Sequence, residues 1–150
     1  MTAFKRRRCY ECGKGTIVPR TVPGRKITFK TLRDLKVPRT LAIPTCDHCG
    51  SEWMDEDTAD AIDQAMYPVY RAEIKAMAQR AIDAICAVVQ QRELESALGL
   101  SSGYISKIKK GDRDPSPELV AHLCTIAINP KARLKEIRAA WEGRLEKQAS

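Results

Sequence analysis

The sequence contains no long apolar run. No stretch approaches the ~18 consecutive apolar residues of a membrane-spanning helix. The N-terminus carries four consecutive cations, Lys5 to Arg8, and no apolar segment follows them, so the pattern of a secretory signal peptide is missing too. These absences argue against membrane and secreted proteins. We expect a soluble, cytoplasmic protein.

Histidine is nearly absent: His48 and His122 are the only two. His48 lies between two cysteines, and His122 lies in a segment expected to form a core helix, so neither suggests a general acid or base. The carboxylates of residues 52–63 suit a helix N-terminus and a solvated face. We therefore expect no enzyme activity. The alternative from the enzyme class is a protein that processes RNA or DNA and uses its N-terminal module as a clamp.

Cysteine is scarce but patterned. Four of the six cysteines form two CxxC pairs that are 33 residues apart, and a glycine follows each pair. Each CxxC turn directs two sulfurs at one point, and Zn²⁺ favours four such ligands in a tetrahedron. Two disulfides would need an oxidising compartment, and a thioredoxin-like redox site needs only one pair. The sequence predicts a structural zinc site formed by Cys9, Cys12, Cys46 and Cys49.

Length and charge divide the chain. Its 150 residues suit one domain or two small ones, and the first 50 could barely bury a core without a metal. Residues 1–50 carry 12 Lys and Arg against 3 Asp and Glu, whereas residues 51–78 carry 2 against 7. The basic balance suggests nucleic acid or an acidic partner. We expect an α+β protein: a zinc-bound β module (1–54), a helical connector (55–78) and an all-α helix-turn-helix domain with a C-terminal helix (79–150).

The N-terminal module should contain a small antiparallel sheet. Strand candidates are 16–18, 41–43 with Val37 before it, and 26–32, where polar and apolar residues alternate. The sheet should have two or three strands and a basic exposed face, and the strand at 41–43 should end at Pro44. Residues 1–8 look like a basic tail, either disordered or in contact with phosphate. Trp53 is expected to pack on this module.

Two helices are expected in the middle of the chain. The acidic residues at 55–57 favour a helix N-terminus, and Pro68 should end or kink that helix. A second helix should run from about Val69 to Val89. Its apolar stripe includes Cys86, which we interpret as a core residue.

A helix-turn-helix pattern follows. A short helix at 91–98 ends at Gly99, and Ser101 is a suitable N-cap for a helix over 102–110 that stops at Gly111. The outward face of the second helix is small or basic, as a helix in the major groove requires. The alternative is a helical hairpin with solvated lysines. The residues expected to contact DNA are Gln91, Arg92, Ser101, Ser102, Gly103, Tyr104, Ser106, Lys107, Lys109, Lys110 and Arg113.

Two further helices should complete the domain. Ser116–Pro117 and Asn129–Pro130 each read as an N-cap followed by proline. On the last helix, Leu134, Ile137, Trp141 and Leu145 recur every three or four residues. This stripe either packs on its own domain or forms the seam of a dimer. We expect a homodimer, because one helix-turn-helix reads only a half-site.

The order of these modules resembles the MqsA-type antitoxin family, which joins a YgiT-type zinc-finger domain to a helix-turn-helix of the Cro/repressor (XRE) class. The resemblance covers most of residues 9–130. The segments that carry it are the two cysteine pairs with their glycines, Val37–Pro38 to Pro44, and residues 91–93, 105–111 and 114–119.

The resemblance implies a dimeric antitoxin that represses its own operon at a palindromic operator on double-stranded DNA. It also implies that the N-terminal domain binds and neutralises a protein toxin, typically a small RNA-cleaving enzyme. Gly103 and Lys107 stand where an amide and an arginine would be familiar, so the operator should differ. The alternative is a stand-alone zinc-containing helix-turn-helix repressor without a toxin.

Overall fold

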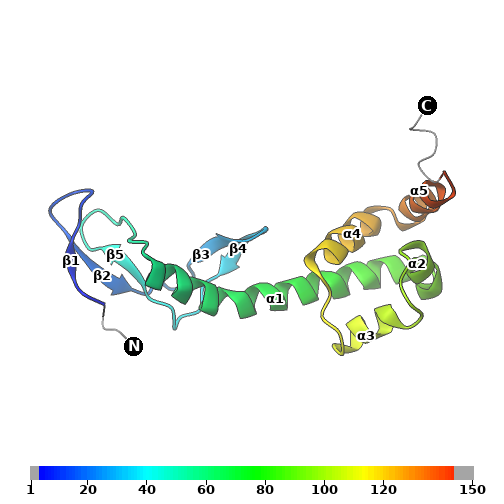
Figure 1. The fold of residues 1–150 in the computed structure, drawn as a ribbon, viewed down its shortest axis with the longest axis horizontal. Helices are drawn as coiled ribbons and strands as arrows, with labels where there is room; N and C mark the ends of the chain where they lie inside the picture. The colour runs from blue at the N-terminus through cyan, green and yellow to red at the C-terminus, as the bar shows by residue number, and fades with distance from the viewer. Residues whose placement is uncertain (1–3, 144–150) are drawn as a thin grey trace. The chain divides into compact units, whose positions relative to one another are not determined.

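The computed structural model describes residues 4–143. The chain divides into two compact units, Met1–Arg71 and Ala72–Ser150, and the helix α1 (Glu56–Cys86) runs through the boundary between them. The strands lie in the first unit and the shorter helices in the second (Figure 1). The expected α+β fold, with a small N-terminal β region followed by helices, is confirmed.

The first unit is built on a three-stranded antiparallel sheet. Its strands are β1 (Arg7–Arg8), β2 (Thr16–Arg20) and β5 (Ile43–Cys46), in the order β1-β2-β5. Residues 7 and 8, expected in a tail, instead pair with β2. Strand β5 starts at Ile43 and continues through Pro44, which was expected to end it. Pro44 lies opposite Pro19 of β2, so two residues that lack an N–H face each other in the ladder.

The stretch 26–32 is a hairpin and not a single strand. It comprises β3 (Lys26–Phe29), a turn at 30–31, and the start of β4 (Leu32–Lys36). Lys30 adopts a left-handed conformation (φ 53°), and its ammonium lies 5.5–6.0 Å from the ring centroids of Phe29, Tyr67 and Tyr70. This cation–aromatic cluster favours the turn. Val37, a further strand candidate, lies just beyond the end of β4.

Helix α1 is continuous from Glu56 to Cys86, so the expected pair of helices separated at Pro68 is wrong. Asp55 caps it as the acidic start suggested, since its Oδ1 accepts a hydrogen bond from the Thr58 N–H (2.9 Å). The buried stripe continues on both sides of the proline, with Met66 and Tyr70 almost inaccessible. Burial of this stripe offsets the roughly 3 kcal/mol that an interior proline costs a helix. Cys86, which was expected in the core, ends the helix and is only half-buried.

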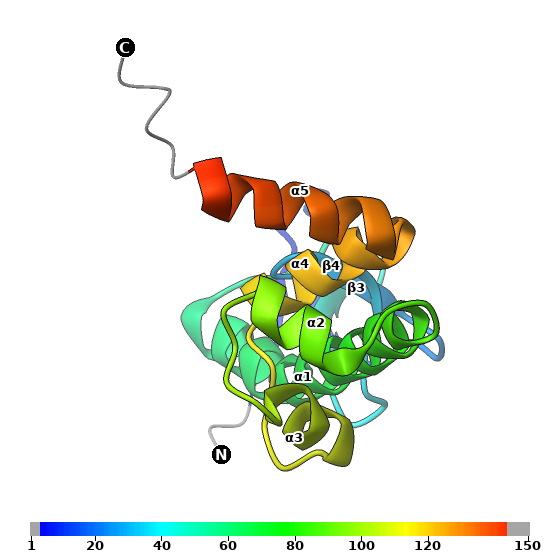
Figure 2. The same cartoon turned by 90° about the vertical axis from the view of Figure 1, so that its right-hand side faces the viewer.

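The second unit holds four shorter helices: α2 (Gln91–Ala97), α3 (Tyr104–Lys110), α4 (Pro117–Ile128) and α5 (Pro130–Gly143). Helix α2 contacts α3 and α5, and α4 contacts α5 (Figure 2). Both expected caps with a following proline are confirmed: Ser116 Oγ accepts from the Leu119 N–H, and Asn129 Oδ1 accepts from the Ala132 N–H. No helix among residues 4–143 is long and apolar enough to cross a bilayer.

The start of α3 differs from the expectation. The helix begins at Tyr104, and its N-cap is Gly103 in a left-handed conformation (φ 81°). Ser101, the expected cap, instead offers its backbone carbonyl to the Tyr104 N–H. Gly103 has no side chain to accept from the first turn, so another group must satisfy the donors there.

Candidate metal centre and nucleic-acid interface

The four cysteines of the two CxxC pairs converge at one point of the first unit. All four sulfurs lie within 4.8 Å of one another. The Sγ atoms of Cys9 and Cys49 are 3.6 Å apart, and those of Cys12 and Cys46 are 3.7 Å apart. A tetrahedral metal with metal–sulfur bonds of about 2.3 Å sets its ligands about 3.8 Å apart. The sulfurs therefore have the spacing that a tetrahedral metal ion such as Zn²⁺ requires.

The backbone of each turn prepares the sulfurs for a cation. Gly13 and Gly50 have positive φ angles (63° and 75°), which close each turn with a hydrogen bond to the carbonyl of its first cysteine. The N–H groups of Gly15 and His48 point at the sulfurs of Cys12 and Cys46 (both 3.4 Å). Such donors stabilise thiolates, the form that binds metal.

The charge balance of the cluster also favours a bound cation. A backbone hydrogen bond from Cys12 lowers the pKa of Cys9 to about 6, and one from Gly15 lowers the pKa of Cys12. Although the Cys49 backbone N–H favours the Cys46 thiolate, burial and the neighbouring sulfurs raise the pKa of Cys46 to about 11. Neighbouring thiolates repel one another, so the four ionise together only when a cation neutralises them.

Gly15 is a further requirement of this centre that sequence reasoning missed. It is buried where the two turns meet, and a Cβ atom there would collide with Cys46 Sγ, with Asp47 Oδ1 (2.7 Å) and with His48 Cβ (2.7 Å). At the glycines that follow the CxxC pairs, a Cβ atom would meet nothing within 4 Å. Only the packing of one turn on the other distinguishes Gly15, and spacing along the chain does not reveal that contact.

Trp53 packs on the cysteine cluster, as expected. It lies against the small core of Cys9, Ile17 and Cys46, and its indole N–H donates to Asp55 Oδ2 (3.0 Å). This hydrogen bond links the cysteine cluster to the residue that caps the start of α1.

The expected DNA-contacting residues lie on or beside α3 and the start of α2. The buried Ile105 and Ile108 anchor α3 to the core. Gln91 of α2 donates to Ser106 Oγ (2.9 Å), which ties the two helices together, and the Arg113 guanidinium lies 4.5 Å from the centre of the Tyr104 ring. Exposed members of the set are Arg92, Ser101, Ser102, Lys107, Lys109, Lys110 and Arg113; Gln91, Gly103, Tyr104 and Ser106 are half-buried.

Lys109 differs from its neighbours. Its ammonium lies 3.6 Å from Asp83 of α1, and both side chains remain partly exposed. An exposed pair of this kind contributes little to stability. It does direct the Lys109 side chain toward α1 within the second unit.

Glu95 is the second functional residue that sequence reasoning missed. It is the one charged residue that is buried among residues 4–143, with 3 % of its surface accessible. Its Oε2 accepts a hydrogen bond from the backbone N–H of Ile105 (3.1 Å), in the first turn of α3. The carboxylate thus replaces the cap that Gly103 cannot supply. The sequence offers one signal of this role: a glutamate that lies between Leu94 and Ala97, two residues that face the core.

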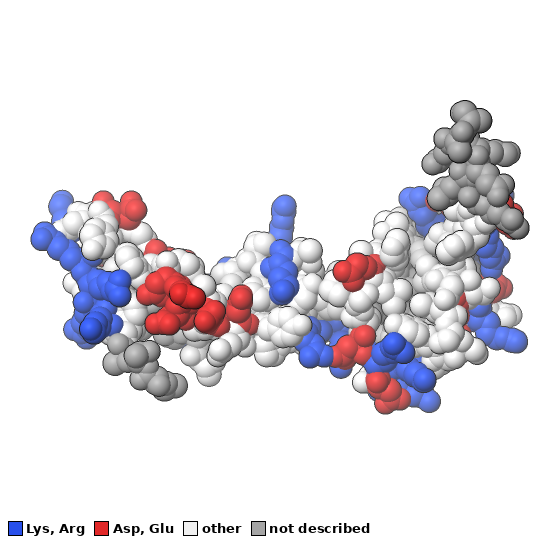
Figure 3. Space-filling view, viewed as in Figure 1, with Lys and Arg blue, Asp and Glu red and all other residues white. Residues whose placement is uncertain are grey.

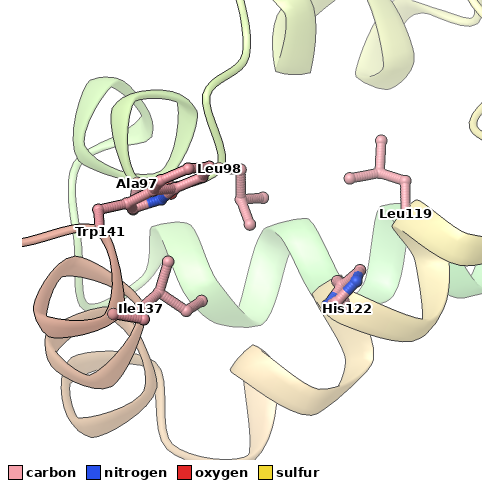
Figure 4. Close-up of a pocket in the computed structure, with 7 residues that line it drawn as sticks. Ala97, Leu98, Leu119, His122, Ile137 and Trp141 are labelled. Atoms are coloured by element: carbon pink, nitrogen blue, oxygen red, sulfur yellow. The ribbon is translucent and has the colours of Figure 1, made fainter. Parts of the chain in front are cut away.

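The second unit also has an apolar groove of about 770 Å³, shown in Figure 4. Trp141 closes one end, where its indole N–H donates to the backbone carbonyl of Ala97 (2.9 Å). Trp141 as a whole stays 66 % exposed, and Leu134 of the same stripe is buried. Leu145, the last residue of the expected stripe, lies outside the described residues. The groove is lined by Ala97, Leu98, Leu119, His122, Ile137, Ala140 and Trp141.

A helix-turn-helix family model matches residues 89–125. No curated protein matches the chain. The match spans α2, α3 and most of α4, so the expected helix-turn-helix is confirmed. A helix-turn-helix of this kind points to a DNA-binding transcription regulator. The match does not reach the cysteine cluster, which could hold a metal ion.

Proposed function

We propose that this chain is a zinc-containing transcriptional repressor, without catalytic activity, that acts as the antitoxin of a type II toxin–antitoxin system. The observation that carries the proposal is the helix-turn-helix of α2 and α3, whose second helix exposes Lys107 and Lys110. The antitoxin role rests on the resemblance to the MqsA-type family. Each part of the proposal has its own experiment.

DNA recognition uses α3 in the major groove. Ser102, Tyr104 and Lys107 reach base edges, while Lys110 and Arg113 contact phosphates. The Tyr104 ring under the Arg113 guanidinium fixes that cation near the end of α3. Lysine contacts to phosphate release counterions, so binding weakens steeply as salt rises.

Selection from a pool of random double-stranded DNA tests this part and identifies the operator. Lys107→Ala is expected to weaken operator binding by about 1–3 kcal/mol, the scale of one good base contact. Lys135→Ala, which removes the same charge from an exposed site on α5, should leave affinity nearly unchanged. Equal affinity of the wild-type chain for operator and scrambled DNA would refute the operator claim.

A homodimer reads the palindromic operator, and the groove beside α5 supports it. An exposed tryptophan at the rim of an apolar groove offers a large area that a second copy could bury. Trp141→Ser should shift the chain toward monomer in sedimentation equilibrium. Ile128→Ser, which changes a residue 78 % exposed at the end of α4, should not. A wild-type chain that sediments as a monomer on operator DNA contradicts the dimer.

Zinc holds the first unit together, with Cys9, Cys12, Cys46 and Cys49 as its ligands. Four sulfurs at tetrahedral spacing support zinc in particular, because structural zinc sites commonly have this ligand set. Four thiolates complete the coordination shell, so the metal stabilises the fold and binds no substrate. Metal analysis of protein purified without chelator should find one zinc per chain.

The antitoxin role is tested by growth. Cells express the open reading frame beside this gene, alone and together with this chain. Growth arrest by the neighbour, relieved by this chain, supports the antitoxin role, and the N-terminal unit is then the surface to map. A harmless neighbour, or toxicity that this chain does not relieve, leaves a stand-alone repressor.

A further inference from the structure

One surface of the first unit plays no part in operator reading. We call it the knuckle surface: the turn that carries Tyr10 together with the exposed cations Lys5, Arg6, Arg7, Arg8 and Lys14. Lys and Arg side chains gather over this end of the unit around β1 (Figure 3). Lys5 and Arg7 share a pocket with Asp55 and Asp57, but the five cations outnumber these carboxylates, so an anionic partner would still bind here favourably.

Tyr10 is the most exposed large apolar side chain among residues 4–143, at 84 %. It lies inside the first CxxC turn, between two candidate metal ligands, so the metal centre fixes its backbone. Its ring lies 6.0 Å from that of Trp53, tilted by 30°. The Arg7 guanidinium lies 5.0 Å from the Trp53 centroid. The surface thus presents an aromatic ring and a cation–aromatic pair together.

Two of the neighbouring cations are ordered by the fold. Arg7 and Arg8 pair with Ile17 and Thr16 in the sheet, and Arg8 Nε donates to the Gly13 carbonyl (2.7 Å). This hydrogen bond joins β1 to the turn that carries Tyr10. A tyrosine and two arginines are therefore held at one place, which lowers the entropy cost of binding a ligand there.

We propose that the knuckle surface binds single-stranded nucleic acid, with a base stacked on Tyr10 and phosphates held by Lys5, Arg6 and Lys14. Proteins that bind single strands combine aromatic rings for bases with cations for phosphates. A duplex hides the faces of its bases inside the stack, so an exposed ring suits a single strand. An acidic protein could also bind the cations, but it would not need an exposed aromatic ring among them.

The binding goes beyond the proposed function, since operator reading requires only duplex DNA at α3. Fluorescence anisotropy of labelled dT12 and rU12, with the full zinc-loaded chain at low salt, measures it. We expect both to bind, and Tyr10→Ala to weaken binding by about 10-fold, the order of one base–aromatic stack. Tyr10→Phe should retain the affinity. Tyr67→Ala, at a half-exposed tyrosine of α1 in the same unit, serves as the control.

The salt dependence tests the phosphate contacts. The double variant Lys5→Gln/Arg6→Gln should reduce the slope of log affinity against log salt by about 1.4, since each contact to a single strand contributes about 0.7. Lys26→Gln/Lys36→Gln removes equal charge from paired positions of the β3–β4 hairpin and should leave the slope unchanged. Equal slope changes in both double variants overturn the proposal, because net charge alone would then explain binding.

Two other results also overturn it. Wild-type chain that binds neither oligonucleotide leaves the surface to another partner, such as an acidic protein. If the Lys107→Ala variant loses single-strand binding while the Tyr10→Ala variant keeps it, the binding belongs to α3. Because Lys107 serves the operator and Tyr10 the single strand, either activity can fail without the other.

Discussion

Replacing Glu95 should weaken the helix-turn-helix more than its place in a helix suggests. Glu95→Ala removes the acceptor of the Ile105 N–H and leaves that donor buried. A hydrogen bond to a charged group contributes about 1.5–3 kcal/mol, and release of the buried carboxylate offsets part of its loss. We expect a net loss of about 2 kcal/mol in the free energy of unfolding of the second unit.

Urea unfolding followed by circular dichroism at 222 nm measures this loss. Glu93→Ala is the matched control: Glu93 lies on the same helix but is exposed, and its ion pair with Arg138 spans 3.4 Å at the surface. That pair should contribute well under 1 kcal/mol. Glu95→Gln keeps an acceptor and should fall between the two. Equal stability of Glu95→Ala and Glu93→Ala would refute the view that Glu95 caps α3.

Three further outcomes follow from the structure. Gly15→Ala should weaken zinc binding by about 10- to 100-fold, as loss of support around a metal site commonly does. The reason is that the added Cβ would separate the two turns. Competition with a chelating dye measures the zinc affinity, and the control Lys14→Ala should bind zinc normally. Complete removal of zinc should unfold residues 1–50 and leave the helix-turn-helix folded; an unchanged circular dichroism spectrum and unchanged proteolysis would contradict it. Burial raises the pKa of Cys86, so its thiolate should form only at higher pH than in the unfolded chain. Alkylation over pH 7–10, followed by mass spectrometry, should therefore show slower modification of Cys86 in the folded protein, and urea should abolish the difference.

Local chemistry made much of this fold predictable. The CxxC turns, the Ser116 and Asn129 caps and the glycine after α2 act within a few residues, so their spacing is visible in the chain. The four cysteines come together because each turn brings two sulfurs to one point. Knowing each pair's local geometry was sufficient to predict the cluster.

The features that were mispredicted or missed depend on contacts between distant segments. Lys30 turns the chain where three aromatic rings meet, two of them from α1. Pro68 stays within a helix because buried residues on both sides hold it. Glu95 caps a helix ten residues away. The alternation of polar and apolar residues, the position of a proline and the type of a residue describe one segment alone. They do not reveal the distant segment that this segment contacts.

The two tryptophans give each unit an optical reporter of its own. The sequence contains only Trp53 and Trp141, and they lie in different compact units. The Trp53 indole packs beside the cysteine cluster and donates to a carboxylate, whereas Trp141 donates from its indole to a backbone carbonyl and stays largely exposed. A Trp→Phe change at either site would leave emission from the other unit alone. Unfolding of the two halves of one unlabelled chain could then be followed separately in the same buffer.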